Sequence, residues 1–323
     1  MTALEVRAPG KLFVIGEYAV LHGGRALVAA IDAGISCGVE GASTWRVSAP
    51  DLGVDGTLAE LSGEPRSALL GSAVSAARDE FRLECPLRFT VRGTRPASRR
   101  KCGLGGSAAS VVAILAAAVA TVGEDLEAKR TRDRLFRCAL AVHRRQQRGR
   151  GSGADVAASV YGGWVDYAPR EGGPRIAAAS LPEGIRLAAA WSGVASDTAR
   201  AIEAFEGAGT LSRLRAILER FWMAVDAEDR AGILSAIDAY GAALEELAGG
   251  SPGAQCIGEL VRAARACGLA AKGSGAVGGD CAIAITFDPT GVPAVEKRWR
   301  TLEAEPLAVS IDARGVRCED SHA

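Results

Sequence analysis

Short apolar runs between glycine and proline residues characterise the first forty positions. Residues 12–15 and 26–31 are apolar, and Pro9-Gly10 precedes the first of these runs. Runs of this length that are bounded by turn residues predict β-strands. Lys11 and Glu17 bracket the first run. They are either edge charges on a half-exposed strand or polar residues of a site.

Helical spacing of apolar positions becomes the dominant pattern further along the chain. It predicts helices over residues 66–83, 107–122, 132–147, 197–206, 211–226, 229–248, 253–267 and 292–304. Strand-like runs lie at residues 87–91, 164–167, 187–191, 281–287 and 307–311. The pattern changes near residue 185 to a helix-rich segment edged by strands. We therefore expect two domains of α/β type, residues 1–184 and residues 185–323.

Composition and charge exclude several classes of protein. A chain of 323 residues can bury one large core or two ordinary ones, and its 48% hydrophobic and 24% charged residues are typical of globular proteins. Lys and Arg number 38, as do Asp and Glu, so there is no net charge for binding nucleic acid or an anionic membrane. We expect neither partner.

The cysteines and the N-terminus indicate a reducing compartment. The eight cysteines have no CxxC and no metal-ligand or disulfide-framework spacing. Cys138, Cys267 and Cys281 lie among apolar residues, which predicts buried free thiols. Residues 1–7 carry charges where a signal peptide needs an apolar core. The longest uncharged apolar run, residues 107–122, is shorter than the roughly 20 residues that a bilayer requires. We therefore expect a soluble, cytoplasmic protein.

The most informative stretch is Lys101-Cys-Gly-Leu-Gly-Gly-Ser-Ala-Ala-Ser110, which leads into an uncharged run. Three glycines in four residues let the backbone approach a ligand, and the helix start that follows offers N–H groups and a positive dipole end. These features suit a phosphate. The alternative is an ordinary turn in which Ser107 is the N-cap of the helix.

Two known phosphate loops fit this stretch poorly. The spacing Gly103-x-Gly105-x-x-Ala108 matches a dinucleotide-binding fingerprint, but residues 94–101 are too polar for the buried strand that must precede it. A Walker-type loop requires Lys and then Ser or Thr directly after the last glycine, whereas Ser and Ala follow here.

A second glycine turn, Gly151-Ser-Gly-Ala-Asp-Val-Ala-Ala-Ser-Val-Tyr-Gly-Gly163, also leads into a helix of small residues. Asp155 in its first turn either complements the helix dipole or is a catalytic carboxylate. The segment just before it, His143-Arg-Arg-Gln-Gln-Arg-Gly-Arg150, is strongly basic. It is either a solvated helix end or a contact for an anionic substrate.

Three glycine-bearing segments in order resemble the signature motifs of the GHMP small-molecule kinases. They are Pro9-Gly-Lys-Leu-Phe-Val-Ile-Gly-Glu-Tyr-Ala-Val-Leu-His22, Gly103-Leu-Gly-Gly-Ser-Ala-Ala109 and Lys272-Gly-Ser-Gly-Ala-Val-Gly-Gly-Asp280. The resemblance spans nearly the whole chain. It implies an α+β fold of two domains, an N-terminal ribosomal-protein-S5-like domain and a C-terminal ferredoxin-like domain, with ATP and acceptor in the cleft between them.

Within this superfamily the segments are most similar to the phosphomevalonate kinases. Gly16-Glu-Tyr-Ala-Val20, Lys101, the segment 151–163 and Trp191-Ser-Gly-Val-Ala-Ser-Asp-Thr198 are in the style of that family. The resemblance implies transfer of the γ-phosphoryl group of ATP to 5-phosphomevalonate, with Mg²⁺. Mevalonate kinase is the nearest alternative, because His22-Gly23 is typical of it. A catalytically silent ligand sensor on the same fold is another. We expect a monomer or a homodimer.

The resemblance also implies a role for individual residues. Lys11 would neutralise charge at the transferred group and Asp155 would orient or deprotonate the acceptor. The residues expected at the ATP phosphates are Lys101, Gly103, Leu104, Gly105, Gly106, Ser107, Ala108, Gly275 and Gly278. Ser107 is also the expected contact for Mg²⁺. The residues expected at the acceptor are Glu17, Tyr18, His22, Arg144, Arg148, Ser152, Ser196 and Thr198.

Two positions depart from the pattern of these kinases. Gly106 stands where the loop usually carries a serine, so one hydroxyl is missing. Mevalonate kinase relatives place a metal-binding glutamate on the helix before the aspartate, but residues 142–151 contain no carboxylate. The sequence therefore identifies no protein ligand for Mg²⁺ other than Ser107.

Overall fold

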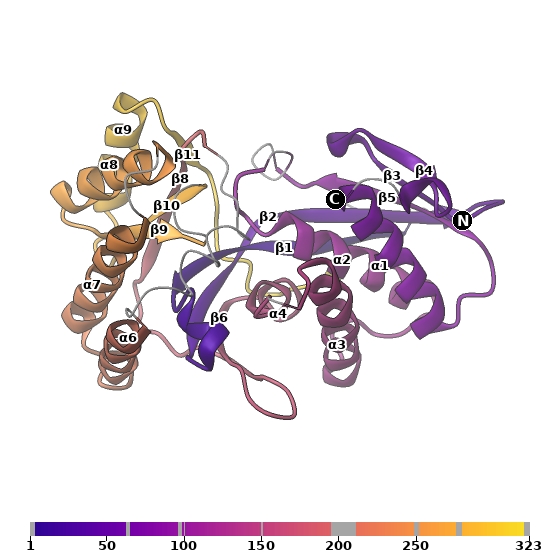
Figure 1. Cartoon of the computed structure of the whole chain (residues 1–323), viewed down its shortest axis with the longest axis horizontal. Coiled ribbons are helices and arrows are strands. Elements are labelled where there is room, and N and C mark those ends of the chain that lie inside the picture. The colour runs from indigo at the N-terminus through magenta and orange to yellow at the C-terminus, as the bar shows by residue number, and fades with distance from the viewer. Residues whose placement is uncertain are drawn as a thin grey trace.

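Two β-sheets flanked by helices make up the fold of the computed structural model, which describes residues 4–62, 65–95, 99, 101–149, 151–194, 211–248, 252–275 and 280–319. The sheets follow one another along an elongated molecule, with the N-terminal sheet at one end and the C-terminal helices at the other (Figure 1). The helix expected at 197–206 and the residues Ser196, Thr198 and Gly278 lie outside the described residues.

The first sheet is built on two long antiparallel strands that run side by side. They are β1 (Leu4–Ile15) and β2 (Ala26–Gly41). The path of the sheet is β12-β1-β2-β5-β3-β4, and β6 and β7 branch from β2. The other strands are β3 (Arg46–Ala49), β4 (Val54–Thr57), β5 (Leu87–Gly93), β6 (Trp164–Ala168), β7 (Arg175–Ala178) and β12 (Arg317–Cys318). Among these pairings only β3–β5 is parallel.

Four helices pack on one face of this sheet, as Figure 1 shows. They are α1 (Pro65–Phe81), α2 (Gly106–Thr121), α3 (Lys129–Gln146) and α4 (Ala154–Tyr161). Residues 108–119 of α2 are all buried, because α1, α3 and α4 surround the helix on the side away from β1 and β2. A helix that is apolar all round is stable only when it is enclosed in this way. This enclosure explains why residues 107–122 include no charged side chain.

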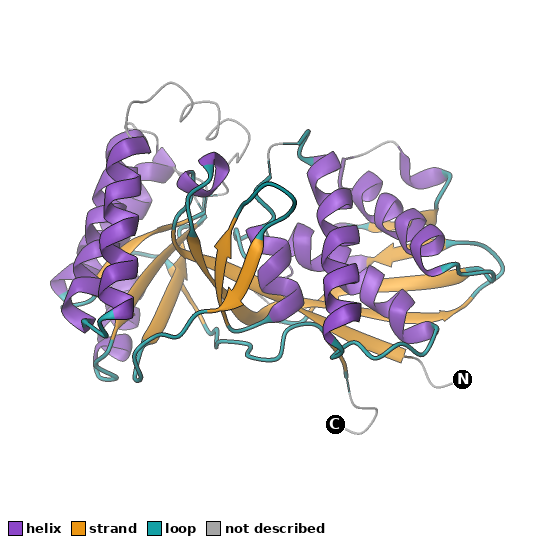
Figure 2. Ribbon diagram, turned by 90° about the horizontal axis from the view of Figure 1, so that it is seen from below, coloured by secondary structure: helices purple, strands orange, loops and turns teal. Residues whose placement is uncertain are grey.

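The second sheet is antiparallel and has the order β11-β8-β10-β9. Its strands are β8 (Arg186–Trp191), β9 (Ala270–Ser274), β10 (Cys281–Thr286) and β11 (Glu305–Leu307). The helices of this half are α6 (Leu211–Asp226), α7 (Arg230–Ala248), α8 (Pro252–Ala266) and α9 (Gly291–Thr301). α8 and α9 pack on the sheet in one core, whereas α6 and α7 form another core with residues of β1 and β2. Figure 2 shows strands running between two groups of helices.

The two sheets are joined through buried side chains. Leu12 of β1 and Ile31 of β2 share a core with Cys281 and Ile283 of β10 and with Leu104 of the glycine loop. The first motif and the strand that follows the third motif are therefore held together, and the hydroxyl of Ser274 in the third motif donates to the carbonyl of Phe13 in the first. The second motif lies in the same core.

The predicted helices in the described part of the chain are confirmed to within a few residues, and so are the strands expected at 87–91, 164–167, 187–191 and 281–287. The strand expected at 307–311 is wrong. β11 ends at Leu307, and the chain then crosses to the first sheet, where Ile311 bridges to Ile31. The strands β3, β4, β7, β9 and β12 were not predicted.

All eight cysteines are free thiols. Cys281 is buried, as expected, whereas Cys138 and Cys267 are only half-buried. Burial raises the pKa of the Cys281 thiol well above its usual value. Among the described residues, no helix combines the length and the apolar character that crossing a bilayer would need.

Candidate active site

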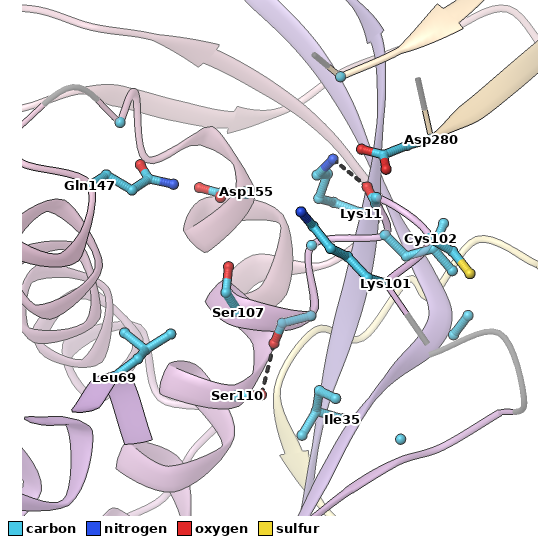
Figure 3. A pocket seen from close by; sticks show the side chains of 18 of the residues that line it. Lys11, Ile35, Leu69, Lys101, Cys102, Ser107, Ser110, Gln147, Asp155 and Asp280 are labelled. Atoms are coloured by element: carbon cyan, nitrogen blue, oxygen red, sulfur yellow. Dashed lines mark hydrogen bonds between the residues drawn. The ribbon is translucent and has the colours of Figure 1, made fainter. Parts of the chain in front are cut away.

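A cavity of about 660 Å³ opens where the three glycine-bearing segments meet. Its lining includes Lys11, Lys101, Ser107, Asp155 and Gly275. Figure 3 shows the side chains of Lys101, Ser107 and Asp155 turned toward a common space, with Lys11 beside it. Residues distant in the sequence thus come together in one site.

β1 carries Lys11 into this site and the glycine loop holds it there. The backbone N–H of Lys11 donates to the carbonyl of Leu104 over 2.8 Å, and its ammonium Nζ donates to the carbonyl of Gly103, also over 2.8 Å. The residue is only 8% exposed. The expectation that Lys11 is an edge charge on a half-exposed strand is therefore wrong.

The loop needs glycine at two positions because other groups come so close. Gly105 has a φ of 79°, and a Cβ built there would lie 2.7 Å from Cγ of Lys11. Gly103 has a φ of 72°, and its Cβ would lie 2.4 Å from Cβ of Asp280. Side chains rarely adopt such φ values and would also collide here.

The N-terminus of α2 faces the cavity. The helix begins at Gly106 with Gly105 as its N-cap, which supplies no side-chain hydrogen bond, and the first intrahelical bond runs from Ala109 N–H to Gly105 O. The amides before Ala109 are the groups that a helix start can offer to an anion. Ser107 is the second helical residue, so the alternative that Ser107 is the N-cap is wrong.

Asp155 lies in the first turn of α4. Its Oδ1 accepts the N–H of Val156 over 2.9 Å. Its Oδ2 lies 3.7 Å from Nδ1 of His143, and Nε2 of that histidine lies 3.2 Å from the hydroxyl oxygen of Ser107. His143 is only 1% exposed. It therefore connects the first turns of α2 and α4 beneath the surface of the cavity.

The turn before Asp155 is fixed by two side chains that bind backbone carbonyls. Arg144 donates to Gly151 and Ser152, each over 3.2 Å, and the hydroxyl of Tyr167 donates to Ser152 over 2.6 Å. Burial raises the pKa of Tyr167 to about 12, with the nearby Asp155 contributing in the same direction. The phenol therefore stays protonated and keeps its donor role.

Glu17 forms a buried ion pair with Lys272 of β9. Their side chains are 4% and 0% exposed. The same carboxylate oxygen accepts the N–H of Gly275 over 3.3 Å, and the hydroxyl of Tyr240 donates to the backbone carbonyl of Glu17 over 2.6 Å. Burial lowers the pKa of Lys272, although Glu17 acts in the opposite direction. Glu17 lines the cavity, but these contacts join the first motif to the third.

The structure places the expected site residues unequally. Most of them line the cavity, namely Lys11, Glu17, Tyr18, Lys101, Gly103, Leu104, Gly105, Gly106, Ser107, Ser152, Asp155 and Gly275. Ala108 is buried in α2 behind this surface. His22, Arg144 and Arg148 are not among the lining residues; His22 and Arg148 are exposed, and Arg144 is half-buried against the carbonyls described above.

Several residues of the site were not assigned a role from the sequence. Arg92, Arg99 and Asp280 line the cavity, while His143 and Lys272 lie beneath its wall. Helical spacing could have identified His143, because it lies four positions after the buried Ala139 on α3 and eight after the buried Leu135.

One end of the cavity has an apolar wall. It comes from β2, β3, β5, α1 and the short turn after β3, and its residues are Ala33, Ile35, Ala49, Leu52, Leu69, Leu70 and Val91. Ile35 and Leu69 mark this end in Figure 3. Asp51, Arg92 and Arg99 also line the cavity from these segments or directly beside them, so charged residues accompany the apolar wall.

The residues of this site suit a Mg²⁺ ion that is held mainly by the phosphates of a nucleotide. The described residues contain no group of three His, Cys, Asp or Glu that could hold a metal by itself. Mg²⁺ usually binds through one or two protein oxygens together with substrate phosphates and water. The Ser107 hydroxyl and Asp155 Oδ2, which both face His143, supply oxygens of this kind.

Comparison with known proteins finds relatives that match along nearly the whole chain or along about half of it. The family model for the GHMP kinases N terminal domain matches residues 68–163. The phosphomevalonate kinase of Streptomyces sp. (strain CL190) is 30% identical over 96% of this chain and 97% of its own. The mevalonate kinase of Methanothermobacter thermautotrophicus is 32% identical over 49% of this chain and 48% of its own.

The fold is also found in solved structures. The Streptococcus pneumoniae phosphomevalonate kinase in complex with phosphomevalonate and AMPPNP superimposes with a TM-score of 0.81. That comparison covers 96% of this chain and 100% of the other at 21% identity, so it shows the fold alone. The full-length similarity to the Streptomyces enzyme, together with the family model, shows that this chain belongs to the GHMP kinases, a family of ATP-dependent small-molecule kinases.

Proposed function

We propose that this chain is a phosphomevalonate kinase, which transfers the γ-phosphoryl group of ATP to 5-phosphomevalonate and releases ADP and 5-diphosphomevalonate. The observation that carries the proposal is the full-length similarity to a phosphomevalonate kinase, because it includes both halves of the site. The similarity to a mevalonate kinase covers only about half of either chain.

The cavity has charges that suit this reaction. Phosphoryl transfer depends mainly on positioning and on neutralising negative charge. The cations that line the cavity are Lys11, Lys101, Arg92 and Arg99. In this proposal the loop amides at the start of α2 and Lys101 hold the ATP phosphates, and the apolar end of the cavity receives the adenine. Mg²⁺, held by Ser107 together with the phosphates, would neutralise further charge.

Lys11 and Asp155 take different parts in the proposed mechanism. Lys11 moves its ammonium from the Gly103 carbonyl toward the transferred phosphoryl group and neutralises it. A phosphomonoester acceptor is largely ionised at pH 7, since its second pKa is about 6. It needs no strong base, so Asp155 acts mainly by orienting the acceptor.

Mevalonate is the second candidate acceptor, and one observation favours it. A phosphorylated acceptor requires more cations than an alcohol, and the basic segment at residues 143–150 was the expected source. Arg144 is instead bound to backbone carbonyls, and Arg148 is exposed outside the cavity lining. With phosphomevalonate as acceptor, its phosphate must therefore rely on other cations of the cavity.

Parallel assays distinguish the two acceptors. The purified chain is given ATP and Mg²⁺ with 5-phosphomevalonate or with mevalonate, and ADP release is measured. We expect turnover with 5-phosphomevalonate and none above background with mevalonate. Turnover with mevalonate alone would show that the chain is a mevalonate kinase. Turnover with neither would remove both assignments and point to a different acceptor or a silent sensor.

A further inference from the structure

We propose that His143 is a positioning residue of the phosphoryl-transfer site, where it fixes the direction of the Ser107 hydroxyl and the orientation of the Asp155 carboxylate. This inference rests on the roles proposed above for Ser107 and Asp155, but it does not depend on which acceptor is phosphorylated.

Burial is the first observation in its support. His143 lies near the end of α3, in a basic segment whose other described residues are half-buried or exposed, yet only 1% of His143 is accessible to solvent. Its Nε2 faces Ser107 of α2 at 3.2 Å and its Nδ1 faces Asp155 of α4 at 3.7 Å. Nδ1 has no hydrogen-bond partner among the described residues. A buried polar atom of this kind needs an explanation.

The neighbours assign the protons of a neutral imidazole. A carboxylate can only accept a hydrogen bond, so the nitrogen facing Asp155, Nδ1, carries the hydrogen. Nε2 then has a lone pair, and the hydroxyl of Ser107 donates to it. At 3.7 Å the contact between Nδ1 and Asp155 is longer than a hydrogen bond, so it is an attraction between an N–H dipole and a negative charge.

This arrangement decides what Ser107 can offer to a ligand. A serine hydroxyl has one hydrogen and two lone pairs. When the hydrogen is given to His143, only lone pairs face the cavity, and they suit a cation better than a phosphate oxygen. Ser107 thereby becomes a ligand for a nucleotide-bound cation and not a donor to phosphate.

The same histidine completes the support of Asp155. One carboxylate oxygen is held by the N–H of Val156, and the other faces His143. The carboxylate plane is therefore held from both sides. Removal of the imidazole would leave Oδ2 without this neighbour, and the carboxylate would rotate more freely.

Two conservative variants separate the two contacts. The amide of asparagine reaches the place of Nδ1, whereas the longer glutamine reaches the place of Nε2. His143→Asn therefore keeps a donor toward Asp155, and His143→Gln keeps a polar atom toward Ser107. His143→Leu keeps the buried volume and loses both contacts. Val142→Ala is the matched control, because it removes buried volume from the same turn of α3 and no polar atom.

The first readout is the tautomer of His143 in the wild-type chain, measured from its ¹⁵N imidazole shifts. Assignment is direct, since the chain has only three histidines. We expect hydrogen on Nδ1, and we expect Ser107→Ala to shift the Nε2 signal and leave Nδ1 unchanged. Hydrogen on Nε2, or ¹⁵N shifts that are the same in the wild type and in Ser107→Ala, would overturn the proposal. This readout requires no turnover, so it remains decisive even when neither acceptor is phosphorylated.

The second readout is the affinity for a non-hydrolysable ATP analogue with Mg²⁺, measured by calorimetry. His143→Leu and His143→Asn should each weaken binding by about tenfold, the effect of one lost hydrogen bond, whereas His143→Gln should stay near wild type. Equal losses in all three variants would mean that His143 only fills space, and the proposal would be wrong.

The third readout is kcat against KM with 5-phosphomevalonate. We expect His143→Leu and His143→Gln, which both lose the contact to Asp155, to lower kcat by about tenfold or more with KM for the acceptor little changed. His143→Asn should retain more of kcat than His143→Leu. Val142→Ala should lower the unfolding temperature and leave kcat unchanged. A wild-type kcat in His143→Leu would contradict the positioning role.

Discussion

Gly105 and Lys11 show how a single residue shapes the site. The loop turns at Gly105 with a left-handed backbone, and the aliphatic part of Lys11 occupies the space that a Cβ at this position would need. The start of α2 and the ammonium of Lys11 can be close only because there is no side chain at this position. The proposed catalytic geometry therefore depends on a residue that contributes no chemical group.

We predict that Gly105→Ala weakens nucleotide binding and lowers kcat together, because Lys11 must move to make room. Gly123→Ala is the matched control. Gly123 has a similar φ of 74°, but a Cβ there has no atom within 4 Å. Calorimetry and ADP release would compare the two variants. Equal effects would mean that backbone strain, and not contact with Lys11, explains the loss.

Sequence motifs pointed to the residues that we propose to bind the substrates, but not to the residues that hold them in place. Lys11, Ser107 and Asp155 lie in segments whose composition is unusual by itself. His143 and Lys272 acquire their roles from partners 36 and 255 positions away. Helical spacing indicates only that His143 is buried, and no local pattern indicates either partner. Arg144 shows the opposite error, since its charge suggested a substrate contact but its guanidinium binds the protein backbone.

At the scale of elements, the buried ion pair of Glu17 and Lys272 joins the turn after β1 to β9. We predict that Lys272→Met lowers the free energy of unfolding by about 3–5 kcal/mol, because it leaves a buried carboxylate unpaired. Adding Glu17→Gln should recover part of this loss. Glu246→Gln is the control, since its partner Arg213 and Glu246 are both at least half exposed and such pairs contribute about 1 kcal/mol or less. Urea unfolding would measure the wild type, Lys272→Met, the double variant and Glu246→Gln. A loss of stability in Lys272→Met that is smaller than the loss in Glu246→Gln would contradict the account.

The hydroxyl of Tyr167 in β6 donates to the carbonyl of Ser152 in the turn before α4, so its titration should affect the free energy of unfolding. Its pKa is raised from 10.0 to about 12, so the folded state holds this proton more tightly than the unfolded state. The contribution is therefore complete below pH 10 and is lost as the pH rises through 12. We predict that the free energy of unfolding falls more steeply between pH 10 and 12 in the wild type than in Tyr167→Phe, by about 2 kcal/mol in total. Parallel curves would show that Tyr167 does not contribute.

Long elements were predictable and short ones were not. α2 was evident because it lacks any charge over its whole length, and α6 to α9 because their apolar positions recur at helical spacing. β3, β4 and β7 have four residues each, too few for alternation to be distinguished from a loop. The wrong strand at 307–311 combined the end of β11 with a crossing segment that is also apolar.

At the scale of the molecule, the two halves are not independent. One core combines Val14 and Leu27 of the first sheet with α6 and α7, and β12 returns from the end of the chain to pair with β1. The two-domain division at residue 185 remains a prediction, although β8, the first strand of the second sheet, begins at Arg186.

We predict that the chain unfolds in a single transition, because this shared core would be exposed if either half opened. The five tryptophans include Trp222 in that core, so fluorescence reports on tertiary packing in both halves, while circular dichroism reports on their helices. The two signals should give the same midpoint and slope in urea. Two separate midpoints would mean that the halves unfold independently.

The most direct test of the account is ADP release in the presence of 5-phosphomevalonate, ATP and Mg²⁺, measured for the wild type, Lys11→Met and Asp155→Asn. Loss of charge at Lys11 should lower kcat by about 10²–10³-fold, as for other groups that stabilise charge in a transition state. Asp155→Asn should have a smaller effect, because an ionised acceptor needs orientation and no base. A wild-type kcat in Lys11→Met, or an enzyme that phosphorylates mevalonate in place of 5-phosphomevalonate, would contradict the account.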